Sequence, residues 1–275
     1  MVRDPAPPRR VLITGGAGLV ATHLVRSLPA HTTVAVTRRR SATAPGVRAH
    51  RVDLRDAEAV HEVFARARPD VVVHTAYSKD ERSDIVDASA CVASACEASG
   101  SSLVHLSSDV VFGGDAAPYV EDDPVAPVND YGRWKAEAES AVRAHVADVC
   151  IVRLSLVVSD DPHDAGSRWL LDEVAAGHAP TLFHDEVRCP IRAEDLAAQI
   201  WALVSLEREA RAGVWHLPGP EALSRWDAGR RVLVAAGLDP SAPVSASAAE
   251  HPEPRPRDLT MLSRRRVPGP EPRPL

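Results

Sequence analysis

A single stretch of the chain, residues 11–21, constrains the fold more than any other part of the sequence. It opens with the apolar run VLIT, turns on glycines and continues with apolar residues at helical spacing. A strand, a glycine turn and a helix in this order are typical of a dinucleotide-binding site, in which Gly15 permits the tight turn and Gly18 leaves space beside the backbone. Ala21 is small enough to let the helix pack on the sheet. The start of the helix then offers free N–H groups to phosphates.

The glycine spacing alone leaves a second interpretation open. The pattern is Gly15-x-x-Gly18-x-x-Ala21, which differs from the GxGxxG of common dehydrogenases. A glycine-rich turn between a strand and a helix, with no ligand, has the same pattern. The remaining motifs therefore have to decide between the two interpretations.

Strand-like and helix-like segments alternate along the first part of the chain, which predicts an α/β fold of the Rossmann type with a doubly wound parallel sheet. We expect strands at about 10–14, 33–37, 47–52, 71–75, 102–106 and 149–154. We expect residues 1–158 to form an NAD(P)-binding Rossmann domain and residues 159–260 a smaller, mostly helical substrate-binding part, some elements of which return to the Rossmann domain. Residues 261–275 are rich in proline and arginine and are expected to be a disordered tail.

Composition excludes several classes of function. The net charge of −6 argues against a general nucleic-acid binder. The chain has no apolar run long enough to span a bilayer and no signal-peptide pattern, so we expect a cytoplasmic protein without a membrane partner. The four cysteines form no CxxC pair, which favours reduced structural thiols and no metal site.

The predicted second strand ends in Arg38-Arg39-Arg40. In a nicotinamide-binding fold this position lies beside the adenosine ribose, where an acidic residue favours NAD and arginine accommodates a 2′-phosphate. We therefore expect NADP(H), although a solvated basic loop would look the same. Asp53, after the third strand, either accepts a hydrogen bond from the adenine or is a simple turn residue.

Tyr131 and Lys135 are four residues apart and share one face of a predicted helix. A lysine beside a phenol is expected to lower the pKa of the phenol and make it a usable proton donor. Ser108, at the end of a neighbouring strand, can bond the same substrate oxygen. With a hydride donor these groups predict carbonyl reduction, whereas an exposed helix face is the alternative.

The motifs together resemble the extended short-chain dehydrogenase/reductase superfamily. They are TGGAGLVA at 14–21, Asp53-Leu54, SSDVVFGG at 107–114 and YGRWK at 131–135. Within that superfamily, LVHLSSDVVFGG is similar to the STDYVFDG segment of the dTDP-4-dehydrorhamnose reductases. The segments CPI and EDLA at 189–197, VWHLPG at 214–219 and RPR at 255–257 resemble further motifs of the same reductases.

The resemblance implies a catalytic triad in which Ser108 polarises the carbonyl, Tyr131 protonates the forming alkoxide, and Lys135 tunes Tyr131 and holds the nicotinamide ribose. The implied cofactor-binding residues are Gly15, Gly18, Leu19, Val20, Arg38, Arg39, Asp53, Leu54, His74, Thr75, Ala76, Tyr131 and Lys135. Candidate substrate contacts are Tyr77, Asp109, Arg153, Arg188 and Arg192, the arginines because a guanidinium suits phosphate geometry.

The implied function is that of an NADPH-dependent ketoreductase in deoxysugar biosynthesis, which reduces a 4-keto-6-deoxy nucleotide sugar or a related ketone. A homodimer is a further expectation. Differences from the reductase motifs, such as Val110 in place of a tyrosine, fall on the substrate side. An epimerase of the same superfamily and a non-catalytic, cofactor-binding regulatory subunit, like the one that binds methionine adenosyltransferase, are the alternatives.

Overall fold

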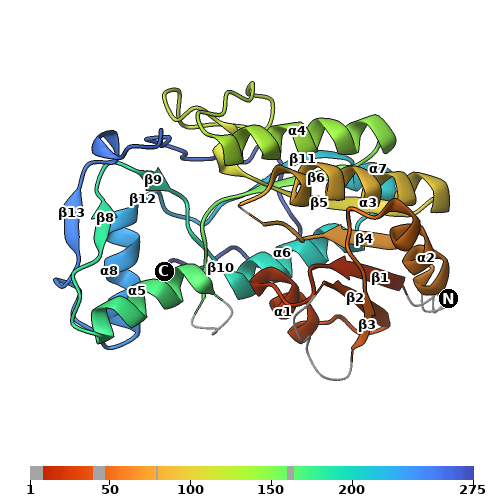
Figure 1. Ribbon diagram of the computed structural model, residues 1–275, viewed down its shortest axis with the longest axis horizontal. Helices are drawn as coiled ribbons and strands as arrows, with labels where there is room; N and C mark the ends of the chain where they lie inside the picture. The colour runs from red at the N-terminus through yellow and green to blue at the C-terminus, as the bar shows by residue number, and fades with distance from the viewer. Residues whose placement is uncertain (1–8, 40–46, 79, 160–163) are drawn as a thin grey trace.

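The computed structural model describes residues 9–39, 47–78, 80–159 and 164–275; Arg40 lies outside them. Its centre is a seven-stranded sheet in the order β11-β6-β5-β4-β1-β2-β3, with every neighbouring pair parallel (Figure 1). The strands of this sheet are β1 (Arg9–Thr14), β2 (Thr32–Arg38), β3 (Arg48–Arg51), β4 (Val71–His74), β5 (Ser102–Ser108), β6 (Cys150–Leu154) and β11 (Gly213–Leu217). The predicted α/β fold of the Rossmann type is confirmed.

Helices cover both faces of the sheet, which explains why its inner strands read as continuous apolar runs rather than as alternating ones. Every residue of β4 is buried, for example. One face carries α1 (Leu19–Arg26) and α6 (Ala193–Ser205), and the other carries α2 (Ala57–Ala67), α3 (Val86–Ser99) and α4 (Asp130–His145). The two apolar layers hold the carboxyl ends of the strands in one row.

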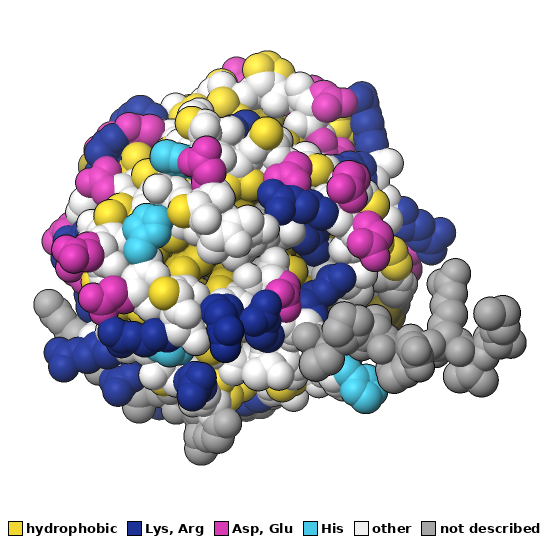
Figure 2. Space-filling view, turned by 90° about the vertical axis from the view of Figure 1, so that its right-hand side faces the viewer, with side chains coloured by type: hydrophobic (Ala, Val, Ile, Leu, Met, Phe, Trp, Pro, Cys, Tyr) yellow, Lys and Arg dark blue, Asp and Glu magenta, His cyan; other side chains and the backbone are white. Residues whose placement is uncertain are grey.

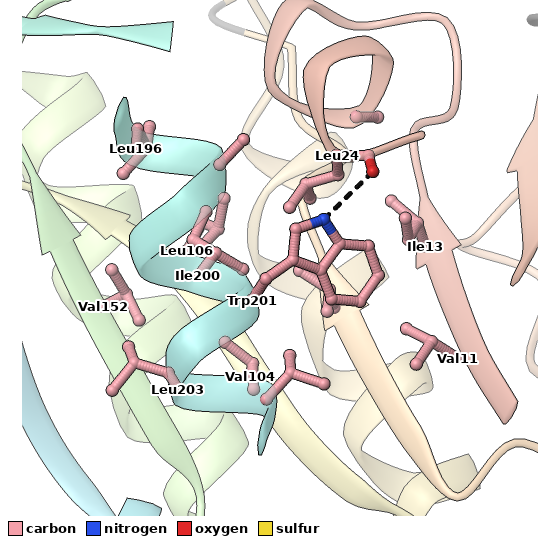
Figure 3. Packing of buried hydrophobic residues seen from close by; sticks show 14 of the residues in the cluster. Val11, Ile13, Leu24, Val104, Leu106, Val152, Leu196, Ile200, Trp201 and Leu203 are labelled. Carbon is pink, nitrogen blue, oxygen red and sulfur yellow. Dashed lines mark hydrogen bonds between the residues drawn. The ribbon is translucent and has the colours of Figure 1, made fainter. Parts of the chain in front are cut away.

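Trp201 of α6 joins the helices of the first face to the sheet. Its side chain is 5% exposed, lies among the apolar residues of that layer, and donates from Nε1 to the Leu24 carbonyl of α1 at 3.0 Å (Figure 3). A buried indole N–H needs such an acceptor, because leaving it unpaired costs free energy. This contact fixes α1, the helix that follows the glycine turn.

A smaller lobe stands beside the sheet, at the left of Figure 1. It contains α5 (Ala165–Ala175) and α8 (Arg225–Ala235), which share the apolar cluster of Leu170, Leu182 and Leu233. Its short strands pair as β8 (Thr181–Phe183) with β13 (Val244–Ala246) and β9 (Val187–Arg188) with β12 (Leu223–Ser224), and β7 (Val157–Val158) pairs with β10 (Ile191–Arg192). The four-residue helix α7 (Arg208–Arg211) precedes β11. Strands of two or three residues carry no periodic signal in the sequence.

Residues 261–275, expected to be disordered, make specific contacts with the rest of the chain. Met261 is buried, and the Arg265 guanidinium lies 3.6 Å from the ring centroid of Trp215. Arg273 pairs with Asp195 at 2.8 Å. The expectation of disorder is wrong for this segment. Arginine side chains in a proline-rich sequence suggest a solvated tail, but here they hold the segment through stacking, hydrogen bonds and ion pairs.

The surface carries charges of both signs. On the face seen in Figure 2, basic side chains gather along the lower part and acidic ones are spread over the upper part. Among the helices of the described residues, none combines the length and the apolar character that crossing a bilayer requires.

Candidate active site

A cavity of about 410 Å³ lies at the carboxyl ends of β1, β2, β3 and β4. Its lining includes most of the residues that the sequence predicts for cofactor binding, together with Tyr77. They are Gly15, Gly18, Arg38, Arg39, Asp53, Leu54, Thr75 and Ala76. Leu19 and Val20 form the first turn of α1, immediately after Gly18.

Gly15 is required at its position by the backbone. Its φ is +69°, and a Cβ there would stand 2.8 Å from the Cα of Ala76. Glycine alone combines this conformation with so close an approach. The turn after β1 therefore packs directly against the segment after β4, and the two form one wall of the cavity.

His74 is buried behind this wall and is not among the residues that line the cavity. The expectation that it contacts the cofactor is corrected in this way. His74 is 2% exposed, and its ring nitrogens contact the hydroxyls of Thr14 at 2.7 Å and Ser89 at 3.1 Å. Burial lowers the pKa of His74 to about 3, so the ring is neutral at physiological pH. The Thr14 hydroxyl also accepts from the backbone N–H groups of Thr75 and Ala76.

The start of α1 is open toward the same cavity. Within the described part of the chain, no side chain caps this helix and no acidic residue stands in its first turn, whereas Asp56 caps α2 and Asn129 caps α4. An uncapped helix N-terminus beside glycines offers N–H donors and a positive dipole end to a pyrophosphate. These residues fit a dinucleotide cofactor.

The far end of the cavity is rich in arginine. Arg39 pairs with Asp84 at 2.9 Å, and Arg55 pairs with Asp53 at 2.6 Å. The hydrogen bonds from Arg55 hold the pKa of Asp53 at about 2. The carboxylates here are thus already paired with arginines. The sequence does not predict a role for Arg55 or Asp84, because neither belongs to a motif.

Ser108 and Tyr131 meet beside this cavity. Ser108 ends β5 and Tyr131 is the second residue of α4, whose N-terminus Asn129 caps by accepting from the Gly132 N–H at 2.9 Å. A side chain at Gly132 would collide with the Val110 carbonyl, so glycine lets α4 approach the turn after β5. The two hydroxyls are hydrogen-bonded to each other.

The phenol of Tyr131 differs from the expectation. Burial raises its pKa well above the ordinary value, the nearby Tyr77 and Asp109 raise it further, and Arg188 and the Ser108 hydrogen bond oppose this only in part. The phenol is therefore protonated at neutral pH, and that is the form that can donate a proton.

The ammonium of Lys135 is held by the neighbouring strand β5. Its Nζ donates to the Leu106 carbonyl at 3.1 Å and lies 4.9 Å from the ring centroid of Tyr77. Lys135 is 5% exposed, and burial lowers its pKa to about 8. The spacing of four residues correctly puts Tyr131 and Lys135 on one helix face, but β5 supplies the acceptor that determines where the ammonium lies.

On the substrate side, Asp109 and Arg188 are brought next to Ser108 and Tyr131. Arg188 donates to Asp109 at 2.6 Å and to Glu186 at 3.2 Å. The other oxygen of Asp109 accepts from Ser155 at 2.7 Å. Asp109 and Arg188 thus join the smaller lobe to the end of β5.

Two of the other predicted substrate contacts have partners within the chain. Arg153 is buried and forms a two-bond ion pair with Glu139 at 2.9 and 3.0 Å. Arg192 donates to the carbonyl of Pro274 at 2.9 Å. Arg153 is paired inside the fold and Arg192 at its surface, and the partners lie 14 and 82 residues away in the sequence, so no local pattern predicts these contacts.

Comparison with known proteins places this site in context. A family model described as "RmlD substrate binding domain" matches residues 9–267. The dTDP-4-dehydrorhamnose reductase of Mycolicibacterium smegmatis is 32% identical over 276 residues, which cover 94% of this chain and 79% of the relative. Methionine adenosyltransferase 2 subunit beta of Mus musculus is 28% identical over 240 residues, covering 80% and 70% of the two chains.

A solved structure shares the fold. The dTDP-4-dehydrorhamnose reductase of Bacillus anthracis, crystallised in complex with NADP, superimposes with a TM-score of 0.78 at 20% identity. The match covers 92% of this chain and 89% of that one.

The burial of the Lys135 ammonium predicts how the free energy of unfolding depends on pH. Its pKa is about 8 in the folded protein against an ordinary value of 10.5, so between these pH values the folded state binds fewer protons than the unfolded state and stability rises with pH. The free energy of unfolding of the wild type, relative to Lys135→Met, is expected to increase by up to about 3 kcal/mol over this range. Urea unfolding at several pH values measures it.

The matched control for this experiment is Arg133→Met on the exposed side of the same helix, which should give a difference that does not change with pH. A Lys135→Met difference that is equally flat between pH 8 and 10.5 would contradict the assignment.

Proposed function

This chain belongs to the RmlD substrate-binding domain family, and from that premise we propose that it is an NADPH-dependent reductase of a ketone-bearing nucleotide sugar. The observation that carries the proposal is the pair of hydrogen-bonded hydroxyls of Ser108 and Tyr131 beside a cavity with a glycine turn at one end and arginines at the other. A relative at 32% identity that is a dTDP-4-dehydrorhamnose reductase supports the substrate class.

The chemistry divides between the cofactor and the residues of the chain. When bound, NADPH supplies a hydride to the carbonyl carbon. Ser108 and Tyr131 share a hydrogen bond, so a carbonyl oxygen that replaces it is within reach of both hydroxyls. Tyr131 gives its proton to that oxygen as negative charge develops there, and Ser108 stabilises the same charge by donating a hydrogen bond.

Lys135 acts from behind Tyr131. The Leu106 carbonyl holds its ammonium 4.9 Å from the ring centroid of Tyr77, a residue that lines the cavity. From there its charge favours the phenolate that Tyr131 becomes after donating its proton. Its part in holding the ribose of the cofactor follows from the family resemblance.

The preference for NADPH is supported by the residues after β2. Arg38 and Arg39 line the cavity where an NAD-dependent protein would carry an acid, and arginine matches the geometry of a phosphate. The Arg39–Asp84 pair is partly exposed, so its exchange for a phosphate costs little.

A second candidate function is that of a regulatory subunit that binds the cofactor without turnover. The similarity to the subunit beta of the mouse methionine adenosyltransferase favours it. The presence of Ser108, Tyr131 and Lys135, with the first two in contact, supports the enzyme.

The cofactor preference is tested by Arg38→Ala/Arg39→Ala. Binding of NADPH is expected to weaken by several kcal/mol at most, since a hydrogen bond to a charged group contributes about 1.5–3 kcal/mol, and binding of NADH is expected to change little. Fluorescence titration with both cofactors measures this. The double variant Arg48→Ala/Arg51→Ala, on the exposed strand β3, should leave both affinities unchanged. Equal affinity of the wild type for NADPH and NADH would refute the preference.

The reductase mechanism is tested by Tyr131→Phe, which removes the proton donor and keeps the ring. With a dTDP-4-keto-6-deoxysugar as substrate, kcat should fall by roughly 10²–10⁴ while the affinity for NADPH is retained. Tyr119→Phe is the control, because that hydroxyl accepts from the backbone N–H of Gly114 and its loss should affect stability rather than kcat. Turnover at the wild-type rate in Tyr131→Phe would eliminate the mechanism and favour the regulatory subunit.

A further inference from the structure

Three arginines and two carboxylates gather where the smaller lobe meets the catalytic hydroxyls. The arginines are Arg188, Arg225 and Arg255, and the carboxylates are Asp109 and Glu186. The cluster therefore carries one positive charge in excess. The pairing of β12 with β9 brings Arg225 to this cluster. Its backbone N–H donates to the Glu186 carbonyl at 2.8 Å.

Both carboxylates of the cluster accept hydrogen bonds through each of their oxygens. Glu186 accepts from Arg188 through one oxygen and from Arg255 through the other. Asp109 accepts from Arg188 and Ser108 through one oxygen and from Ser155 through the other. Neither carboxylate has an oxygen left without a donor.

Arg225 is the cation of the cluster to which neither carboxylate is hydrogen-bonded. No residue of the described ranges forms a hydrogen bond or an ion pair with its guanidinium, although the side chain is partly buried. It also stands at the first position of α8, where the helix dipole disfavours a positive charge. Burial lowers the pKa of Arg225, as expected for a charge that is partly removed from water.

A second arginine of the cluster has an unused donor. The Nε of Arg188 is buried and has no partner in the described structure, while the two terminal nitrogens of its guanidinium hold Asp109 and Glu186. Buried donors are nearly always paired, so the unpaired Nε of Arg188, next to a half-buried guanidinium without a partner in the described structure, indicates a place for an acceptor.

The cluster is within electrostatic reach of the reacting groups. The charges of Asp109 and Arg188 act on Tyr131 as well as on Arg225. The geometric link is Asp109, which accepts from Arg188 at 2.6 Å and from the Ser108 hydroxyl at 3.1 Å, so a ligand that contacts Arg188 and Arg225 lies near Ser108.

We propose that Arg225, beside Arg188, binds an oxyanion of the substrate, and that this contact selects an anionic ketone for the active site. The inference rests on the proposed function and names a specificity-determining residue for it. A phosphate of a nucleoside diphosphate and a carboxylate of an acidic sugar share this chemistry, and both match the planar fork of a guanidinium.

The test measures binding without turnover, so its result is separate from that of the reductase assay. Calorimetric titration of the NADPH-loaded protein with dTDP and with glucuronate should show binding of at least one of the two probes. The probe that Arg225 holds should bind Arg225→Gln roughly tenfold to hundredfold more weakly, and Arg225→Lys should recover part of this loss. Loss of dTDP binding identifies the phosphate as the source of the oxyanion, and loss of glucuronate binding identifies the carboxylate.

Arg230→Gln is the matched control, because Arg230 lies on the exposed face of the same helix and donates only to the Pro240 carbonyl among the described residues. It should bind both probes as the wild type does. Failure of both probes to bind the wild type at millimolar concentration, or wild-type affinity in Arg225→Gln, would overturn the proposal.

A stability measurement separates a binding role from a structural one. Arg225→Met should leave the Tm of the ligand-free protein unchanged or raise it, since it removes an unpaired, partly buried charge. Arg188→Met breaks two ion pairs and should lower the Tm. A drop in Arg225→Met as large as that in Arg188→Met would show that Arg225 holds the fold together and would also overturn the proposal.

Discussion

The contact between the turn after β1 and the segment after β4 is the constraint on which the rest of the site depends. Gly15 packs against the backbone of Ala76, and the Thr14 hydroxyl ties the two strand ends together by accepting from Thr75 and Ala76. This place lies between β1 and β4, where the strand order changes direction. Open α/β sheets form their ligand crevice at such a point. His74, neutral and buried, holds Thr14 in position and makes the wall rigid.

A similar close approach builds the catalytic half of the site. Gly132 lets α4 come against the Val110 carbonyl, and this brings the Tyr131 hydroxyl to Ser108. Burial then keeps the phenol protonated, and the Leu106 carbonyl keeps the Lys135 ammonium in place. The direction of the proposed reaction agrees with these states, because reduction of a carbonyl needs a proton donor. Burying these polar groups costs free energy of folding, and the apolar layers on both faces of the sheet offset that cost.

The sequence predicts the parts of this molecule that depend on local patterns. The glycine turn, the buried strands and the Tyr131–Lys135 spacing are periodic or short-range features, and the fold they predict is confirmed. The role of each arginine is not predicted, because the sequence does not show whether a guanidinium contacts solvent, a carboxylate or a ligand. Arg153 pairs with Glu139 inside the fold, and Arg265 stacks on Trp215 in a segment that composition suggests is disordered. The pKa of Tyr131 likewise depends on burial, which the spacing to Lys135 does not reveal.

The central claim is that this site transfers a hydride from a nicotinamide cofactor to a sugar ketone while Tyr131 supplies the proton. The most direct measurement follows the label from NADPH that carries deuterium at both C4 positions of the nicotinamide, in the presence of a dTDP-4-keto-6-deoxysugar. The account predicts one deuterium on the carbinol carbon of the product for each cofactor oxidised. Tight binding of NADPH without transfer of deuterium to any member of a panel of such ketones would contradict it.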